Sequence, residues 1–228
     1  MKFLIYIVLA LSLSLFSSCG SEPLTKAIPE ISAYCGTKDI QVGVASAVSG
    51  KESINAYTLE VANIKAIKDG YPAALVSSQC AKLFFDALTK EQRKDKNTIR
   101  VTVKSESKSE TTDYKMEDME RVGAFVKDGN KVINLIKKGK YNNMYAMADP
   151  EFVTKEAFDI LVRDIFEKQK TILAKTNKIQ DDGFEFLEVN GVHFVNVFAH
   201  TPIDSLSVNY KVTFTDEKNP KIAGFFIK

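Results

Sequence analysis

His193 and His200 are the residues of this chain best suited to proton transfer near neutral pH. They lie seven positions apart in an apolar run, residues 192–201, that is expected to form one strand. Successive side chains of a strand point to opposite faces, so an unbroken strand separates the two histidines. Only a β-bulge between them would bring both into one pocket. We therefore expect each to be a structural or exposed histidine, and no acid–base catalyst in the chain.

Three tyrosines could form the rim of a ligand pocket. Tyr141 and Tyr145 are four positions apart in an expected helix, residues 141–148, and Tyr210 belongs to a later strand. A packing role is the competing interpretation for Tyr141 and Tyr145.

Metal and cofactor chemistry find no support in the residue pattern. Asp181 and Asp182 are adjacent acids that we expect in a turn before the sheet, and two acids are too few for the six to eight oxygens of a calcium site. There is no Gly-rich phosphate loop, no nucleophile elbow and no spaced Cys/His set. We expect no bound metal and no cofactor.

A different chemistry is expected at Cys19. Ahead of it lie Lys2 and an apolar run, residues 3–16, that is too short for a comfortable membrane span and is typical of an export signal. Residues 15–19, Leu-Phe-Ser-Ser-Cys, resemble the lipobox of bacterial lipoproteins, although Phe16 stands where Leu or Val is usual. The resemblance implies cleavage between Ser18 and Cys19 and lipidation of Cys19. The alternative is an ordinary secretory signal that leaves Cys19 as a free thiol.

Length and charge limit the remaining possibilities. The chain has 228 residues and a formal charge of +2, and cleavage after Ser18 removes only one charged residue, Lys2. A nearly neutral protein lacks the excess of positive charge that binds the phosphates of nucleic acid. The size fits one large domain or two small ones, and we expect two.

The first expected domain, residues 40–115, has the order strand, strand, helix, strand, strand. Alternation predicts strands over 40–48, 54–64 and 99–104 and a return strand near 114–116, while an apolar stripe with Pro72 at its start predicts a helix over 72–88. Thr89 and Gln92 resemble a capping box. Residues 19–39 are expected to be the lipid anchor and a flexible tether; Ile28, Ile31 and Tyr34 instead favour a packed N-terminal arm.

Cys80 lies on the apolar stripe of the helix over 72–88, where a free cysteine behaves as a small hydrophobe. The other interpretation is a disulfide with Cys35, which closes a loop of about 46 residues. Both interpretations stay open at this point.

The second expected domain, residues 125–228, has helices followed by a sheet. Asp128-Gly129-Asn130 is expected to interrupt the first helix and mark the domain boundary, Gly139 to end it, and Thr154 to begin the longest apolar stripe. Asn190-Gly191 predicts a type I′ hairpin. A strand over 206–215 follows, and residues 222–227, apolar on both faces, are expected to form a central strand.

This order of elements resembles the nuclear-transport-factor-2-like, or cystatin-like, cone found as a domain of unknown function in many small bacterial lipoproteins. The resemblance is carried by residues 135–141, by the helix after Asp149-Pro150, and by the closing residues 221–226. It implies a pocket between the helices and a curved antiparallel sheet.

The sequence therefore predicts an α+β protein of two small domains. We expect a lipid-anchored, non-enzymatic binding or interaction lipoprotein of the cell envelope; the alternative is a cone-pocket enzyme of isomerase or hydrolase type. Expected partners are the membrane through the lipid, an envelope protein or a small apolar ligand, and a second copy through the C-terminal sheet. In a cell with two membranes, Gly20 after the lipidated cysteine favours the outer membrane.

Overall fold

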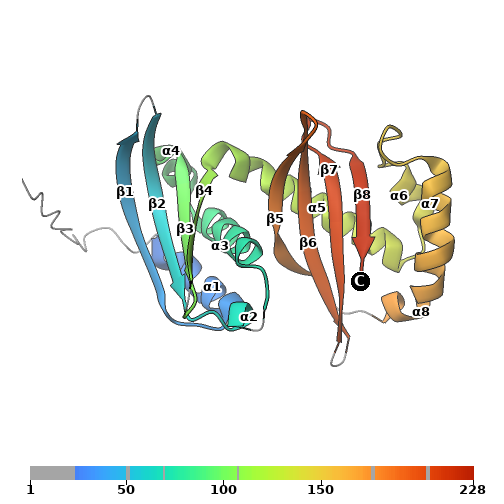
Figure 1. The fold of residues 1–228 in the computed structure, drawn as a ribbon, viewed down its shortest axis with the longest axis horizontal. Coiled ribbons are helices and arrows are strands. Elements are labelled where there is room, and N and C mark those ends of the chain that lie inside the picture. The colour runs from blue at the N-terminus through green and yellow to red at the C-terminus, as the bar shows by residue number, and fades with distance from the viewer. Residues whose placement is uncertain (1–23, 50–51, 69, 107, 176–177, 204–205) are drawn as a thin grey trace, which may run out of the picture.

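The structure is a computed structural model that describes residues 24–49, 52–68, 70–106, 108–175, 178–203 and 206–228. The described residues form an α+β fold with two four-stranded sheets, which confirms the fold class (Figure 1). The lipobox and Cys19 lie outside the described residues. Among the helices that are described, none has the length and apolar character needed to cross a membrane.

The N-terminal half has the expected order of elements. They are η1 (Leu24–Ala27), α1 (Ile28–Cys35), β1 (Ile40–Ser49), β2 (Glu52–Ala62), α2 (Lys65–Lys68), α3 (Ala73–Ala87), α4 (Lys90–Asp95), β3 (Thr98–Lys104) and β4 (Ser109–Lys115). The strand order is β1-β2-β3-β4, with β2 and β3 parallel and the other pairs antiparallel. A parallel pair needs a crossover connection, which α3 supplies. The buried stripe of α3, including Val76, Cys80 and Phe84, covers one face of this sheet.

The N-terminal segment corrects the tether prediction. Residues 24–35 are helical, and Ala27, Ile31 and Cys35 are fully buried in the core. Buried apolar side chains hold this segment against the fold, so it is the packed arm that the alternative interpretation predicted.

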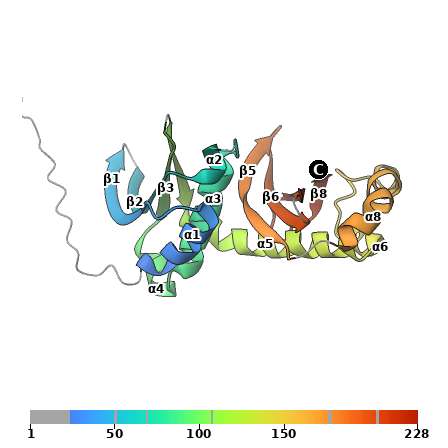
Figure 2. The same ribbon diagram turned by 90° about the horizontal axis from the view of Figure 1, so that it is seen from below.

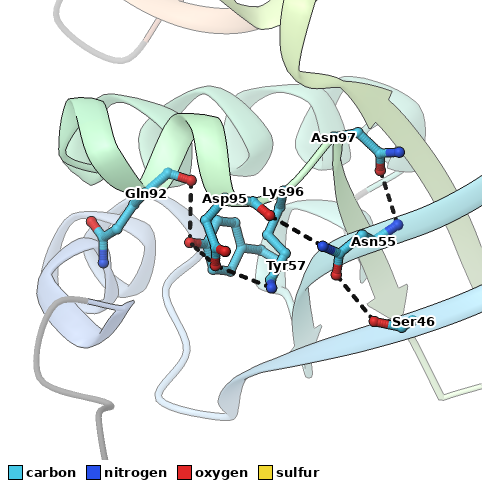
Figure 3. Close-up of polar contacts among 7 residues, drawn as sticks. All are labelled: Ser46, Asn55, Tyr57, Gln92, Asp95, Lys96 and Asn97. Atoms are coloured by element: carbon cyan, nitrogen blue, oxygen red, sulfur yellow. Dashed lines mark hydrogen bonds and ion pairs between the residues drawn. The ribbon is translucent and has the colours of Figure 1, made fainter.

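A polar network fixes the turn between α4 and β3 (Figure 3). The Tyr57 hydroxyl donates to the Gln92 carbonyl at 3.2 Å, and the Asn55 side-chain amide donates to the Asp95 carbonyl at 3.1 Å. The Asn97 side chain accepts from the Asn55 backbone N–H at 2.9 Å. Gln92 also completes the predicted capping box with Thr89, which is confirmed. These contacts join the hairpin β1–β2 to the start of β3, so the network is structural.

Helix α5 (Met116–Lys137) connects the two halves without a break. The predicted interruption at Asp128-Gly129-Asn130 is therefore wrong, and a join near Lys127–Lys131 would fall inside this helix. A Cβ on Gly129 would lie 3.1 Å from Cγ1 of Val197 in the second sheet. Gly129 thus allows close packing of α5 on the sheet, and does not break the helix. Figure 2 shows α5 running beneath the second sheet.

The described part of the C-terminal half contains four further helical segments and the second sheet. They are α6 (Tyr141–Tyr145), α7 (Lys155–Leu161), the π-helical turn η2 (Val162–Phe166) and α8 (Glu167–Ala174), followed by β5 (Gln180–Val189), β6 (Val192–Ile203), β7 (Leu206–Thr215) and β8 (Ile222–Ile227). The sheet is an antiparallel meander in the order β5-β6-β7-β8. Positive φ angles at Asn190 and Gly191 confirm the predicted hairpin turn. The Thr154 side chain caps α7, as expected for the start of the long helix.

Strand β8 corrects a second prediction. It is the last strand of the sheet rather than a central one: β7 is its neighbour among the described strands, and on its other side Ile222 forms an isolated parallel bridge with Ala148. Its alternate side chains differ in environment: the Phe225 ring packs on Phe166 of the helical layer, whereas Phe226 is 54% exposed. Residues 222–227 are therefore apolar on both faces of β8, although the helical layer covers only the face of Phe225 and solvent reaches the face of Phe226.

Helix α3 lies between the two sheets and contacts both (Figure 1). One continuous cluster of buried apolar side chains extends through both halves, including Phe84, Phe125 and Phe214. At the closest approach, the Ser78 hydroxyl donates to the Leu75 carbonyl at 2.9 Å and accepts from the Phe184 backbone N–H at 2.9 Å. These bonds satisfy a backbone group at the free edge of β5.

Candidate functional site

A concave groove opens where the two halves meet. It has a volume of about 380 Å³ and is lined by α1, by the segment before α3, and by β5, β6 and β7. We call it the junction groove; the residues that matter most are Tyr34, Tyr71, Asp182, His200, Ser207 and Asn209. Its walls thus come from parts of the chain more than a hundred positions apart.

A histidine–aspartate pair lies in the junction groove. His200 Nδ1 is 2.7 Å from Oδ1 of Asp182, and the two side chains are 27% and 8% exposed. The hydrogen bond to Asp182 and the charge of that carboxylate raise the pKa of His200, although partial burial opposes the shift. The pair therefore favours the protonated form of His200.

Two tyrosines of the N-terminal half, Tyr34 and Tyr71, interact with Asp182. The Tyr34 hydroxyl donates to the backbone carbonyl of Asp182 at 3.2 Å. Burial, and then the charge and hydrogen bond of Asp182, raise the pKa of Tyr71. Burial is also the main cause of the raised pKa of Tyr34. Both hydroxyls stay protonated at physiological pH, so Asp182 is held by donors from both halves.

A bulge in β5 places Asp182 in the groove. The register between β5 and β6 shifts between Asp181 and Gly183, so Asp182 has no direct partner on β6. Asp181 accepts instead from the side-chain amide of Asn130 on α5 at 3.0 Å. The prediction that the two acids form a turn before the sheet is wrong, because both lie within β5.

The predicted separation of the histidines is confirmed. Strand β6 pairs with β7 without a register shift from Phe194 to Ile203, so the two histidines point to opposite faces. The His193 side chain is 64% exposed, with Nδ1 3.9 Å from Glu188. His200 nevertheless lies in a concave site with a hydrogen-bonded acid. Sequence analysis missed this site because the acid is on the neighbouring strand and the tyrosines belong to the other half.

The three tyrosines expected at a cone rim pack against other aromatic rings. Tyr141 stacks on Phe166 with ring centres 5.5 Å apart, and burial together with Glu167 raises the pKa of Tyr141 to about 12. Tyr145 contacts Phe158. Tyr210 is 2% exposed, and its hydroxyl is 3.2 Å from Oγ1 of Thr201.

The space between the C-terminal helices and sheet is a small apolar cavity of about 40 Å³. Met144, Phe158, Leu161 and Phe225 are among its lining residues. A cavity this size holds about one to three water molecules. The ligand-sized space of the junction groove is therefore a better candidate site than this cavity.

Metal ligands are not grouped in the described residues: no cluster of three or more His, Cys, Asp or Glu side chains is suitably placed. Cys35 and Cys80 lie close together beneath the junction groove, with their sulfur atoms 3.3 Å apart.

The fold and site define an α+β protein with a ligand-sized groove between its two halves that contains a histidine–aspartate pair. Comparisons with protein-family models, with curated proteins and with solved structures each found no match. The likeness to nuclear-transport-factor-2-like lipoproteins therefore stays a prediction.

The raised pKa of His200 predicts how stability changes with pH. A raised folded-state pKa stabilises the protein fully below the unfolded pKa of histidine, and this contribution is lost as the pH rises through the folded-state pKa. Replacing His200 by Gln should therefore lower the free energy of unfolding by about 1–2 kcal/mol at pH ~5.5 and by much less at pH ~9. Urea unfolding across this pH range measures the difference.

The matched control for this measurement is His193→Gln, which changes the exposed histidine of the same strand. Its stability should follow the wild-type pH dependence. If the difference between wild type and His200→Gln does not change with pH, the Asp182–His200 pair does not stabilise protonated His200.

Proposed function

We propose that this protein is an exported lipoprotein of the cell envelope, anchored through Cys19, and that it binds a small ligand in the junction groove without chemical conversion. The observation that carries the binding part is the groove itself. Its volume of about 380 Å³ lies within the range of small-molecule sites. Its polar groups are held in place by one hydrogen bond between the two halves, Tyr34 to Asp182, and one within the C-terminal half, His200 to Asp182, so little ordering is needed on binding.

The lining favours a neutral or positively charged ligand with hydrogen-bonding groups. Asp181 and Asp182 supply carboxylates, of which Asp182 pairs with His200 and Asp181 has no cationic partner among the lining residues that the structure describes. Tyr34 and Tyr71 supply aromatic rings, and none of the described lining residues is Lys or Arg. Aromatic faces attract ammonium groups, and nearby carboxylates add to this attraction. We therefore propose a small ammonium compound, in place of the apolar ligand expected for a cone.

Choline and dimethylbutanol, its uncharged isostere with carbon in place of nitrogen, test the ligand class. We expect choline to bind the mature chain carrying Cys19→Ser, and the isostere to bind about tenfold more weakly. Tyr71→Leu should weaken choline binding by about tenfold or more, because it removes a ring of the groove. Titration calorimetry measures the affinities.

His193→Gln is the matched control, because His193 is exposed and does not line the groove. It should bind choline as the wild type does. Equal affinity for choline and its isostere would contradict the charge preference, and equal affinity of wild type and Tyr71→Leu would contradict binding in the groove.

An acid–base enzyme is the second candidate function, and the Asp182–His200 pair favours it. An aspartate bonded to Nδ1 of a histidine orients the ring for proton transfer at its other nitrogen. Ser207 also lines the groove, but no hydrogen bond joins it to His200 in the described part of the chain. Conversion of a bound compound that is lost in His200→Gln would replace the binding proposal by this one.

The proposal also includes the envelope partners. A second copy of the chain docking on the C-terminal sheet is supported by Leu206 and Phe226, which are 76% and 54% exposed on β7 and β8. An envelope protein could use the same surface, and outer-membrane delivery rests on Gly20 alone.

A further inference from the structure

Cys35 and Cys80 face each other across a contact between two helices. Cys35 is the last residue of α1, and Cys80 lies in the middle of α3. The two sulfur atoms are 3.3 Å apart, and the residues are 2% and 0% exposed. The contact is therefore part of the folded core and is not created by surface mobility.

The two thiols are free in the structure and their sulfur atoms are in non-bonded contact. The sulfur atoms of a disulfide are about 2.05 Å apart, so a shift of a little over 1 Å, within reach of side-chain rotation, would bond them. We propose that Cys35 and Cys80 form an intramolecular disulfide in the mature protein. Its occurrence in the cell rests on the export stated under Proposed function, because disulfides persist in oxidising compartments. The contact between the two sulfur atoms is a property of the fold and does not depend on export.

The bond forms by two thiol–disulfide exchange steps with a small disulfide oxidant such as oxidised glutathione. One thiolate attacks a sulfur of the oxidant and releases one glutathione thiolate, which leaves a mixed disulfide. The second thiolate then attacks the protein sulfur of that mixed disulfide and releases the other glutathione. The two cysteines together lose two protons and two electrons, and the oxidant becomes two glutathione thiols.

Oxidation should occur while the chain folds and not afterwards. The hydrogen bond between the two thiols and the burial of Cys80 raise the pKa of Cys80 well above its usual range, so little thiolate is present in the folded protein. Near-zero exposure also keeps a glutathione molecule away from both sulfurs. In the unfolded chain both thiols are exposed, and the burial that raises the pKa of Cys80 is absent.

The disulfide would stabilise the wall of the junction groove. Tyr34, next to Cys35, donates to the Asp182 carbonyl, and Ser78, two positions before Cys80, accepts from Phe184. Both contacts hold β5 against the N-terminal half. A covalent link between α1 and α3 therefore fixes the two elements that position the groove.

Refolding with glutathione tests the bond directly. The chain from residue 19 onward, carrying Cys19→Ser, retains Cys35 and Cys80 as its cysteines. It is unfolded, reduced, and refolded with oxidised and reduced glutathione. We expect a mass lower by two hydrogen atoms and one linked peptide that contains both cysteines. The melting temperature should fall by roughly 10 °C after reduction. Protein that refolds with two free thiols overturns the proposal.

The matched controls are Cys35→Ala and Cys80→Ala in the same chain, whose melting temperatures should not respond to reductant. If either variant fails to fold, the response of the parent chain to reductant still decides the question. Protein from the native host, alkylated during lysis, should contain the same linked peptide, and free thiols there overturn the proposal for the cell. Acyl chains on Cys19, measured by mass in the same sample, test export separately.

Discussion

Gly183→Ala is expected to lower the free energy of unfolding by about 3–5 kcal/mol. Gly183 follows the bulge of β5 with φ of +134°, a conformation that L side chains rarely adopt. A Cβ there would lie 2.4 Å from the Ser78 hydroxyl and 2.6 Å from the Leu75 carbonyl oxygen. The carbonyl is helix backbone and cannot move away without breaking the contact between α3 and β5.

Gly191→Ala is the matched control. Gly191 also has a positive φ, +79°, but nothing lies within 4 Å of its added Cβ. It should cost about 1–2 kcal/mol, the price of the backbone conformation alone. Urea unfolding measures both variants, and equal losses would contradict the tight approach at the junction.

Gly183→Ala also tests the prediction that the two halves are separate folding units. Each half has its own sheet, so a loosened junction should leave two cooperative transitions where the wild type shows one. A single transition in Gly183→Ala would instead indicate one shared folding unit.

Cys19→Ala is expected to abolish lipidation, so that the chain either stays uncleaved at this site or is released from the membrane as an unlipidated product. Each buried CH₂ of an acyl chain contributes about 0.8 kcal/mol to membrane binding, so two or three chains hold a protein firmly and their loss removes the anchor. Fractionation of the native host followed by immunoblotting measures the distribution. Intact-mass analysis of the wild type should show acyl chains on an N-terminal Cys19.

Cys35→Ala is the matched control for this experiment, since it changes a cysteine that the lipobox does not contain. It should stay with the membrane. Wild-type protein that is cleaved before an unmodified Cys19 would show an ordinary secretory signal and contradict the anchor.

Local signals were sufficient to predict most of the elements. The apolar stripe of α3 and the start of α7 at Thr154 appear where periodicity and capping predict them. The Asn190-Gly191 turn is a further example, because it depends on the conformational preferences of two adjacent residues.

Features that depend on packing between distant segments could not be predicted in this way. From the sequence alone, Gly129 is expected to break the helix. Only the close approach of Val197 to Gly129 explains why a glycine stands inside a continuous helix. The apolar run of β8 does not reveal that one of its faces is left open. The junction groove combines Tyr34 and Tyr71 with an aspartate that a bulge displaces, and no sequence spacing encodes that combination.

The most direct test of the central claim is an NMR titration of the isotope-labelled mature chain, carrying Cys19→Ser, with choline. The junction groove is lined by Ile64, Val76 and His200, whereas Met144 and Leu161 line the small cavity of the C-terminal half. We expect the side-chain resonances of the first set to shift in a saturable way while those of the second set stay unchanged. Shifts confined to Met144 and Leu161, or no saturable shift at the groove, would contradict the claim that the junction groove is the binding site.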